Sequence, residues 1–351
     1  MMNRIVFDVG HPAQVHNFKY VHSILKSKGW NSSFTLKNKE IAALLLQTYG
    51  IPFQRLFANK SNIFLNLVCN VLNIGIFSCY CIIKRPTLII SRGSFHSVIV
   101  SNILRITHIM LSDTEHSRDF SNYVDVTLTN NSFRKKLGKN HIRFNSNIEL
   151  FYLHPNYFSR PTKRSAQKEK KILIRFVSWN AHHDKGMVGL SLQQKINAVK
   201  SFSKYGRVYI SSEKELPVEL KQYQIKISPE EMHIFISQCS IVYGESATMA
   251  SEAAMLGVPA IYHDNFGRGY TDEEETYGLV YNYSESESDQ KAAIDKGIDI
   301  LNLSESVITD RYNLFMENKI DPVKFLIWFI ENYPKSRKIM LENPEYQNIF
   351  R

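Results

Sequence analysis

The sequence predicts two α/β domains in tandem, each built on a parallel sheet with helices on both faces. The chain has 351 residues, of which 44% are hydrophobic and 22% charged, which is ordinary globular composition but too long for one typical core. Short apolar runs of strand type alternate with segments of helical period on both sides of a polar, highly charged stretch at 159–171. This stretch is the best linker candidate. We therefore expect an N-terminal domain over 1–160, a second domain over 161–330 and a C-terminal helical tail over 331–351.

The first apolar run opens the N-terminal sheet almost at the start of the chain. Strands are expected at 5–8, 31–36, 88–91, 107–111 and 124–128, with helices at 15–28 and 39–49. This alternation is typical of parallel strands joined through helices. The start lacks the basic, apolar and small-residue regions of a secretory signal, so we do not expect export.

One further segment of this half, 63–83, is apolar enough to be mistaken for a membrane span. Three asparagines interrupt it at helical spacing and form one polar face, namely Asn66, Asn70 and Asn73. We favour a mostly buried helix of the N-terminal domain. An interfacial membrane-docking helix with basic flanks stays open, as does a true span, although asparagines are costly in lipid.

The second half repeats the alternation after the linker. Strands are expected at 172–176, 207–211, 224–227, 240–243 and 260–262, with helices at 192–204, 230–239 and 248–256. The acidic run 284–289 is interpreted as a loop in water. Helices expected at 307–318 and over the aromatic run 325–330 suggest a C-terminal segment that packs back at the junction of the domains.

The charge is concentrated in the first half of the chain. Residues 1–160 carry 19 Lys and Arg against 7 Asp and Glu, whereas residues 161–351 carry 24 against 26. A basic half attracts polyanions or an anionic membrane surface. Because the sequence has no helix-turn-helix, zinc-finger or RNP-like signature, we do not expect a nucleic-acid partner. The four cysteines are too few for a disulfide framework, which favours a reducing compartment, the cytoplasm.

Polar residues follow two predicted strands of the first domain, where open α/β sheets bind ligands. The loop after the first strand holds His11, Gln14 and His16. An imidazole there suits a general base that deprotonates a hydroxyl, and the alternative is a histidine that caps the helix or packs. The strand at 107–111 leads into Asp113-Thr114-Glu115-His116, which adds two carboxylates at the same edge.

A second cluster follows the first strand of the second domain, at 175–186. Its cationic, amide and imidazole donors suit a diphosphate, and the candidates are Arg175, Ser178, Trp179 and His183. A metal site on His182-His183-Asp184 and an ordinary surface loop are the alternatives. We expect no metal, because adjacent side chains of one loop rarely reach a single ion.

The third cluster, at 243–261, is the most specific. A strand ends at Tyr243, small residues form a tight loop and a helix begins near Ala247, so backbone N–H groups and the helix dipole face an anion. Glu252 lies one to two turns into that helix, where a carboxylate accepts from the two hydroxyls of a ribose. The donor-binding candidates here are Gly244, Glu245, Ser246, Ala247, Thr248 and Glu252.

The third cluster resembles the donor-nucleotide half of GT-B glycosyltransferases, and is similar to the bacterial transferase that adds N-acetylglucosamine to the lipid-linked peptidoglycan precursor. The whole chain resembles more closely a predicted glycosyltransferase family catalogued as domain of unknown function 354, with matches at 8–16, 113–116, 178–184 and 244–260. The resemblance implies a GT-B fold, in which two Rossmann-like domains face each other across a cleft. The N-terminal domain would bind the acceptor and the C-terminal domain the donor nucleotide.

The resemblance also implies roles for single residues. Glu252 matches the glutamate that holds the donor ribose, and Ser246, Ala247 and Thr248 match the loop that meets nucleotide and phosphate. Gln14 stands where the peptidoglycan enzyme has a histidine, so the catalytic base is left open. The candidates for it are His16 first, then Asp113, His11 and Glu115. Further candidates for acceptor-binding or loop residues are Gln14, Arg92, His116 and Arg268.

We therefore expect a metal-independent glycosyltransferase without a cofactor, which moves a sugar from a nucleotide-sugar donor to an acceptor hydroxyl. Its acceptor would be a surface glycan or a lipid-linked glycan, in the cytoplasm or at the inner face of the cell membrane. A non-hydrolysing nucleotide-sugar epimerase is the alternative, but the Arg-Pro-Glu loop of such epimerases is missing where this chain has His11-Pro12-Ala13. An alternative of another class is a non-catalytic subunit that binds nucleotide or membrane.

Overall fold

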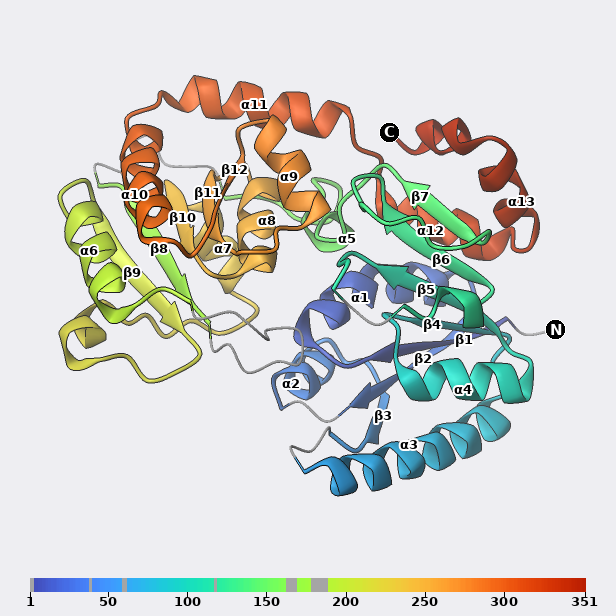
Figure 1. Cartoon of the computed structure of the whole chain (residues 1–351). Coiled ribbons are helices and arrows are strands. Elements are labelled where there is room, and N and C mark those ends of the chain that lie inside the picture. The colour runs from blue at the N-terminus through green and yellow to red at the C-terminus, as the bar shows by residue number, and fades with distance from the viewer. Residues whose placement is uncertain (1–2, 38–39, 59–61, 117–118, 162–168, 178–188) are drawn as a thin grey trace. The chain divides into compact units, whose positions relative to one another are not determined.

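The computed structural model describes residues 3–37, 40–58, 62–116, 119–161, 169–177 and 189–351 (Figure 1). The chain divides into two compact units: unit 1 is Met1–Tyr152 with Ile320–Arg351, and unit 2 is Leu153–Lys319. Each unit has one parallel sheet with helices, so the expected two α/β domains are confirmed. The boundaries at 152/153 and 319/320 differ from those expected at 160/161 and 330/331.

The sheet of unit 1 has the strand order β3-β2-β1-β4-β5-β6-β7, and all its pairs are parallel. Its strands are β1 (Arg4–Val9), β2 (Asn31–Lys37), β3 (Phe53–Leu56), β4 (Leu88–Ser91), β5 (Thr107–Ser112), β6 (Val126–Asn130) and β7 (His141–Phe144). The order reverses between β1 and β4, and ligands of doubly wound sheets bind at such a switch point, beyond the carboxyl ends of the strands.

Helices of unit 1 come from both ends of the chain. They are α1 (Pro12–Ser27), α2 (Glu40–Thr48), α3 (Ile63–Lys84), α4 (Phe95–Leu104), η1 (Ser121–Tyr123), α5 (Leu150–Leu153, at the boundary), α12 (Pro322–Glu331), α13 (Lys335–Glu342) and η3 (Pro344–Phe350). The C-terminal helices belong to unit 1, since α12 packs on α1 and α13 on β7. Phe325 of α12 stacks on Phe144 of β7 with ring centroids 5.7 Å apart. The apolar face of the aromatic run is therefore covered within unit 1.

The helix expected at 63–83 forms as α3, but its interpretation as a mostly buried helix is wrong. Only 17% of its most apolar stretch is buried, although the helix is long and apolar enough to cross a membrane. Its buried face contains Asn73, which accepts from the Phe57 N–H (2.7 Å) and donates to the Phe57 carbonyl (3.0 Å). The exposed large apolar side chains of α3 are Ile63, Phe64, Leu65, Leu67, Val68, Val71, Leu72, Ile82 and Ile83.

Unit 2 has a parallel sheet with the order β12-β11-β10-β8-β9, which reverses between β8 and β10. Its strands are β8 (Lys171–Phe176), β9 (Arg207–Ser212), β10 (Ile241–Gly244), β11 (Ala260–His263) and β12 (Val280–Tyr283). Its helices are α6 (Leu192–Phe202), η2 (Val218–Tyr223), α7 (Met232–Ser237), α8 (Ala247–Met255), α9 (Gly269–Thr276), α10 (Glu287–Leu301) and α11 (Glu305–Glu317). Phe202, Tyr243 and Ile261 lie in the core between sheet and helices.

Some short strands escaped prediction. The structure adds β3, β7 and β12, each of four residues, and the strand expected at 224–227 is reduced to a bridge between Gln224 and Ile210. These three strands are only partly buried, whereas β4, β10 and β11 are equally short but buried throughout, and their apolar runs lie where strands were expected.

Candidate functional site

One glycine shapes the turn from β10 into α8 in unit 2. Gly244 has a φ of 150°, and a Cβ there would lie 2.0 Å from the carbonyl oxygen of Arg175 on β8. No side chain fits at that distance, so only glycine allows this approach. The Glu245 N–H donates to the same carbonyl (3.1 Å), which fixes the turn against β8.

The start of α8 presents backbone donors at the carboxyl edge of the sheet. Ser246 is the N-cap, and its hydroxyl accepts from the Met249 N–H (3.3 Å). Ala247 and Thr248 are the first two helical residues, whose N–H groups have no acceptor within the helix. These donors and the helix dipole favour an anion. The geometry is the one expected from the sequence, and phosphate contact at Ser246, Ala247 and Thr248 stays a prediction.

Glu245 is buried, and its carboxylate accepts hydrogen bonds from the backbone instead of facing a ligand site. Its Oε2 accepts from the Val177 N–H (3.0 Å) and its Oε1 from the Leu190 N–H (2.6 Å). Both carboxylate oxygens therefore hold the chain on either side of 178–188. Sequence reasoning missed this role because backbone donors leave no motif.

The interpretation of 284–289 as a loop in water is only partly right: residues 286–288 are exposed, but α10 begins at Glu287 and Glu285 is bound by its neighbours. Glu285 accepts from the Gly189 N–H (2.9 Å) and from the Asn265 side chain (2.7 Å), and Ser286 caps α10. The loop thus joins the turn after β11 to the chain segment before α6.

Of the four candidates in the second predicted cluster, the structure describes Arg175. Ser178, Trp179 and His183 lie outside the described residues. The Arg175 guanidinium donates to Ser211 Oγ (2.8 Å) and to Glu213 Oε1 (2.6 Å). Because β9 neighbours β8, this pairing holds the cation toward β9, and its charge is balanced by Glu213.

Glu252 lies in the second turn of α8 and has a partner that the sequence analysis did not identify. Its Oε1 is 3.0 Å from Nε2 of His233 on α7, and both residues are buried. The edge of the Phe158 ring packs against His233. The pair orients the carboxylate, and contact with a ribose stays a prediction.

Arg268 follows β11 as the N-cap residue of α9. Its Nε donates to the Tyr262 hydroxyl (3.3 Å), which in turn donates to Asp264 (2.5 Å). Burial alone would lower the pKa of the Arg268 guanidinium, but the neighbouring tyrosines and Asp264 outweigh it and raise that pKa. The structure therefore holds a permanent cation near the carboxyl end of β11.

In unit 1, the loop between β1 and α1 is stabilised by its own side chains. His11 is the N-cap of α1, and its Nδ1 accepts from the Ala13 N–H (3.3 Å). Gln14 Oε1 accepts from the Gly10 N–H (2.6 Å). The capping interpretation of His11 therefore describes its observed contact, and a role as base stays a prediction.

His16 is buried on α1, at the same edge of the sheet. Its Nδ1 lies 3.3 Å from the Tyr49 hydroxyl, and its ring packs on Tyr152 with centroids 5.3 Å apart. A hydroxyl partner and an aromatic neighbour fix the orientation of the imidazole.

Asp113 and Arg92 form an ion pair between the loops after β5 and β4. Arg92 also donates through Nη1 to Asn17 Oδ1 (3.2 Å), and Asn17 donates to the Ile148 carbonyl (3.1 Å). The two predicted residues are thus brought together. The Asp113 carboxylate is therefore bound by a cation.

Glu115 and His116 lie at the end of the same loop. Glu115 is buried, with Oε1 accepting from the Arg134 N–H (2.9 Å) and its carbonyl accepting from Lys135 Nζ (2.6 Å). This carboxylate positions the segment after β6. His116 is exposed, and its N–H donates to Thr114 Oγ1 (3.4 Å).

Asp8, at the end of β1, has a role that the sequence analysis did not assign. The carboxylate is buried, accepts from Thr35 (2.7 Å) and from Ser94, and lies 3.0 Å from His96 Nε2. Burial alone would raise the pKa of Asp8, but His96 and the two hydroxyls outweigh it and lower that pKa. This network fixes the turn between β4 and α4 that carries Arg92. An acidic residue within an otherwise apolar strand was the available signal.

No group of three or more His, Cys, Asp or Glu side chains in the described ranges is arranged to hold a metal ion. Metal independence stays a prediction, since part of the second cluster lies outside these ranges.

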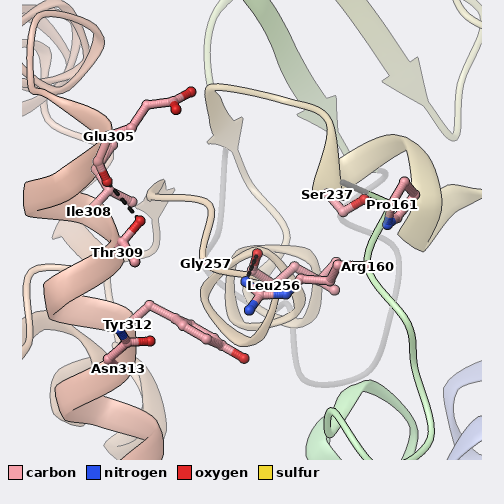
Figure 2. Close-up of a pocket in the computed structure, with 10 residues that line it drawn as sticks. All are labelled: Arg160, Pro161, Ser237, Leu256, Gly257, Glu305, Ile308, Thr309, Tyr312 and Asn313. Atoms are coloured by element: carbon pink, nitrogen blue, oxygen red, sulfur yellow. Dashed lines mark hydrogen bonds between the residues drawn. The ribbon is translucent and has the colours of Figure 1, made fainter. Parts of the chain in front are cut away.

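A cavity of about 280 Å³ lies elsewhere in unit 2 (Figure 2). Its wall includes Arg160, which donates to the Leu256 carbonyl (3.0 Å) and lies over the Tyr312 ring. This cavity borders the carboxyl end of α8, away from the Ser246 cap, and none of the predicted site residues lines it. It therefore supports none of the sequence-based predictions.

No family model matches the sequence, and no curated protein matches it. Solved structures do match its fold. The chain is similar to a protein described as a UDP-N-acetylglucosamine 2-epimerase from Listeria monocytogenes, with a TM-score of 0.69, 11% identity, and coverage of 95% of this chain and 97% of that chain. MurG from Acinetobacter baumannii matches with a TM-score of 0.60, 11% identity, and coverage of 94% and 99%.

The spinosyn rhamnosyltransferase SpnG in complex with thymidine diphosphate matches with a TM-score of 0.62, 12% identity, and coverage of 94% and 100%. The neighbours are thus glycosyltransferases of the GT-B type and nucleotide-sugar epimerases, which confirms the expected GT-B fold. At this level of identity the likeness concerns the fold alone.

Proposed function

We propose that the chain is a glycosyltransferase that moves a sugar from a nucleoside-diphosphate donor to an acceptor hydroxyl. The observation that carries this proposal is the start of α8, which presents backbone N–H donors at the carboxyl edge of the sheet. The turn that leads into it requires Gly244. The glycosyltransferases among the fold neighbours support this class of reaction, and one of them was solved with thymidine diphosphate.

The donor would bind to unit 2. Its phosphates would accept from the N–H groups of Ala247 and Thr248, which stabilise the charge that develops on the leaving group. Arg268 would supply a cation at the neighbouring strand end, and Glu252, oriented by His233, would accept from the ribose hydroxyls. None of these contacts needs a metal ion or a cofactor.

The acceptor would be activated in unit 1. His16 is the preferred general base, because its imidazole is oriented by Tyr49 and Tyr152, whereas the Asp113 carboxylate is neutralised by Arg92. The base would take the proton from the acceptor hydroxyl as its oxygen attacks the anomeric carbon and the nucleoside diphosphate leaves. We propose a lipid-linked or surface glycan as the acceptor class, and the cytoplasm as the compartment, where cysteine thiols stay reduced.

The test is a thermal-shift screen of the purified chain against UDP, GDP, CDP, ADP, TDP and CMP, because a ligand stabilises the folded state by mass action. We expect one nucleotide to stabilise the wild type and the exposed control Glu317→Ala, but not Glu252→Ala. The absence of a response to every nucleotide would overturn the donor assignment.

Epimerisation of a nucleotide sugar is the second candidate, favoured by the likeness to the Listeria monocytogenes protein. Incubation with the nucleotide sugar alone separates the two reactions. An isomerised donor without any acceptor would establish the epimerase. Nucleotide binding without turnover of donor, with or without acceptor, would instead favour a non-catalytic subunit.

A further inference from the structure

Helix α3 exposes most of its large apolar side chains, unlike a typical surface helix of a soluble protein. Its polar side chain Asn73 faces unit 1, whereas its large apolar side chains face outward, as with Leu67 and Val71, which are 60% and 61% exposed. A contiguous exposed apolar face of this kind marks an interaction site.

The inward face ties α3 to unit 1 over much of its length. The Asn73 amide makes two hydrogen bonds to the Phe57 backbone, and Phe77 and Cys81 pack with Val6 and Ile89 of the sheet. Figure 1 shows α3 beside α4 and close to β3, and these elements are in contact. These contacts hold α3 against unit 1, so a surface that covers its outward face would meet the helix lying flat.

The charge around α3 has one sign. Between Glu40 and Asp113 the sequence contains six Lys and Arg and no Asp or Glu. Three basic residues gather at the carboxyl end of α3: Lys84 and Arg85 end the helix, and Arg4 donates to the Lys84 carbonyl (3.1 Å). An outward apolar face whose charged neighbours along the chain are all basic complements an anionic lipid surface.

We infer that α3 docks unit 1 on an anionic lipid bilayer, with its outward side chains among the acyl chains and its basic end at the headgroups. A second copy of the chain fits this face less well, because pairing two such faces would bring like charges together. The inference concerns lipid binding alone and does not rest on the proposed transfer reaction.

The test is co-sedimentation of the full chain with vesicles of phosphatidylcholine alone and with vesicles in which about a third of the lipid is phosphatidylglycerol. The variant Leu67→Asp/Val71→Asp places two acidic charges on the outward face, where both side chains are exposed and folding is spared. The matched control Val218→Asp/Leu314→Asp changes two side chains of unit 2 that are 80% and 54% exposed. A third variant, Lys84→Glu, tests the basic end.

We expect the wild type and the control to bind the anionic vesicles, and the Leu67→Asp/Val71→Asp variant to bind at least about tenfold more weakly. Lys84→Glu should also weaken binding, because it reverses a charge at the basic end of α3. A rise in ionic strength from about 0.1 to about 0.5 M should weaken binding as well, because salt screens the headgroup attraction. Binding of the Leu67→Asp/Val71→Asp variant as tight as that of the wild type would overturn the inference. A wild-type dimer that this variant makes monomeric, with no vesicle binding, would overturn it in favour of a second copy.

Discussion

Glu252 and His233 form a pair in unit 2, with Oε1 of the carboxylate 3.0 Å from Nε2 of the imidazole and only 10% and 9% of the two side chains exposed. The pair joins α8 to α7, so the glutamate that would hold a ribose is also part of the packing of the unit. The two roles are separable by experiment.

Glu252→Ala should weaken binding of the preferred nucleoside diphosphate by about 10- to 100-fold, because a hydrogen bond to a charged group contributes about 1.5–3 kcal/mol. His233→Ala breaks the same pair but leaves the carboxylate in place, so its affinity should fall less. Calorimetric titration of both variants measures the difference. Equal losses in the two would show that the pair matters for packing and not for ribose binding.

Gly244→Ala should lower the free energy of unfolding by about 3 kcal/mol and abolish nucleotide-induced stabilisation, since its Cβ would meet the Arg175 carbonyl. Gly75→Ala on α3 is the matched control, because no atom lies within 4 Å of a Cβ there. That change should raise the free energy of unfolding by about 0.5–1 kcal/mol. Urea unfolding with and without nucleotide measures both effects, and a fully stable Gly244→Ala protein would contradict the geometry of the turn.

His16→Ala should lower turnover by about 100-fold or more while nucleotide binding survives, because a general base acts only on the reacting proton. Asp113→Asn is the comparison, since it removes the other candidate base and frees Arg92 from its ion pair. We expect it to retain more activity than His16→Ala in a donor-consumption assay. Near-normal turnover of His16→Ala would remove this residue from the mechanism.

Acid should destabilise unit 1 through His108, whose pKa is lowered from about 6.5 to about 4 by burial. The folded state keeps this imidazole neutral between Ser91 and Ser101, whereas the unfolded chain binds a proton near pH 6.5. Its contribution to stability is therefore complete above that pH. It is lost as the pH falls toward about 4, by about 1.4 kcal/mol per pH unit.

Urea unfolding between about pH 7.5 and about pH 5 measures this loss, and His108→Gln should reduce the slope of stability against pH by about one proton. The control is His11→Gln at the exposed cap of α1, where no such reduction is expected. An unchanged slope in His108→Gln would contradict the assignment.

The sequence predicted those parts of the fold whose pattern is local. Strand β10 and the turn into α8 carry an apolar run, small residues and a serine cap, and these signals lie within a few residues of each other. The outward face of α3 was an open alternative to the favoured buried helix, because composition shows how apolar a helix is but not which side a neighbour covers. The polar stripe was read correctly as one face, and Asn73 in fact points inward to bind the Phe57 backbone.

Within the candidate site, the sequence analysis identified residues such as Glu245 and Glu252 but not the groups to which they hydrogen-bond. Glu245 was chosen for its place in a loop, yet its carboxylate binds two backbone N–H groups that are 68 and 55 residues away. The same holds for Glu252, whose partner His233 lies on another helix. Such pairings depend on tertiary packing and leave no trace in residue spacing.

The return of the chain into unit 1 has a consequence for its synthesis on the ribosome. The Ile320 N–H donates to the Asn145 carbonyl (3.0 Å), and Phe325 covers Phe144, so a segment translated after unit 2 completes the first unit. Unit 2 is continuous in sequence and can fold as soon as it emerges, whereas unit 1 must wait with an aromatic surface uncovered. A nascent chain halted before Ile320 therefore carries a finished unit 2 and an unfinished unit 1, which is a natural substrate for chaperones.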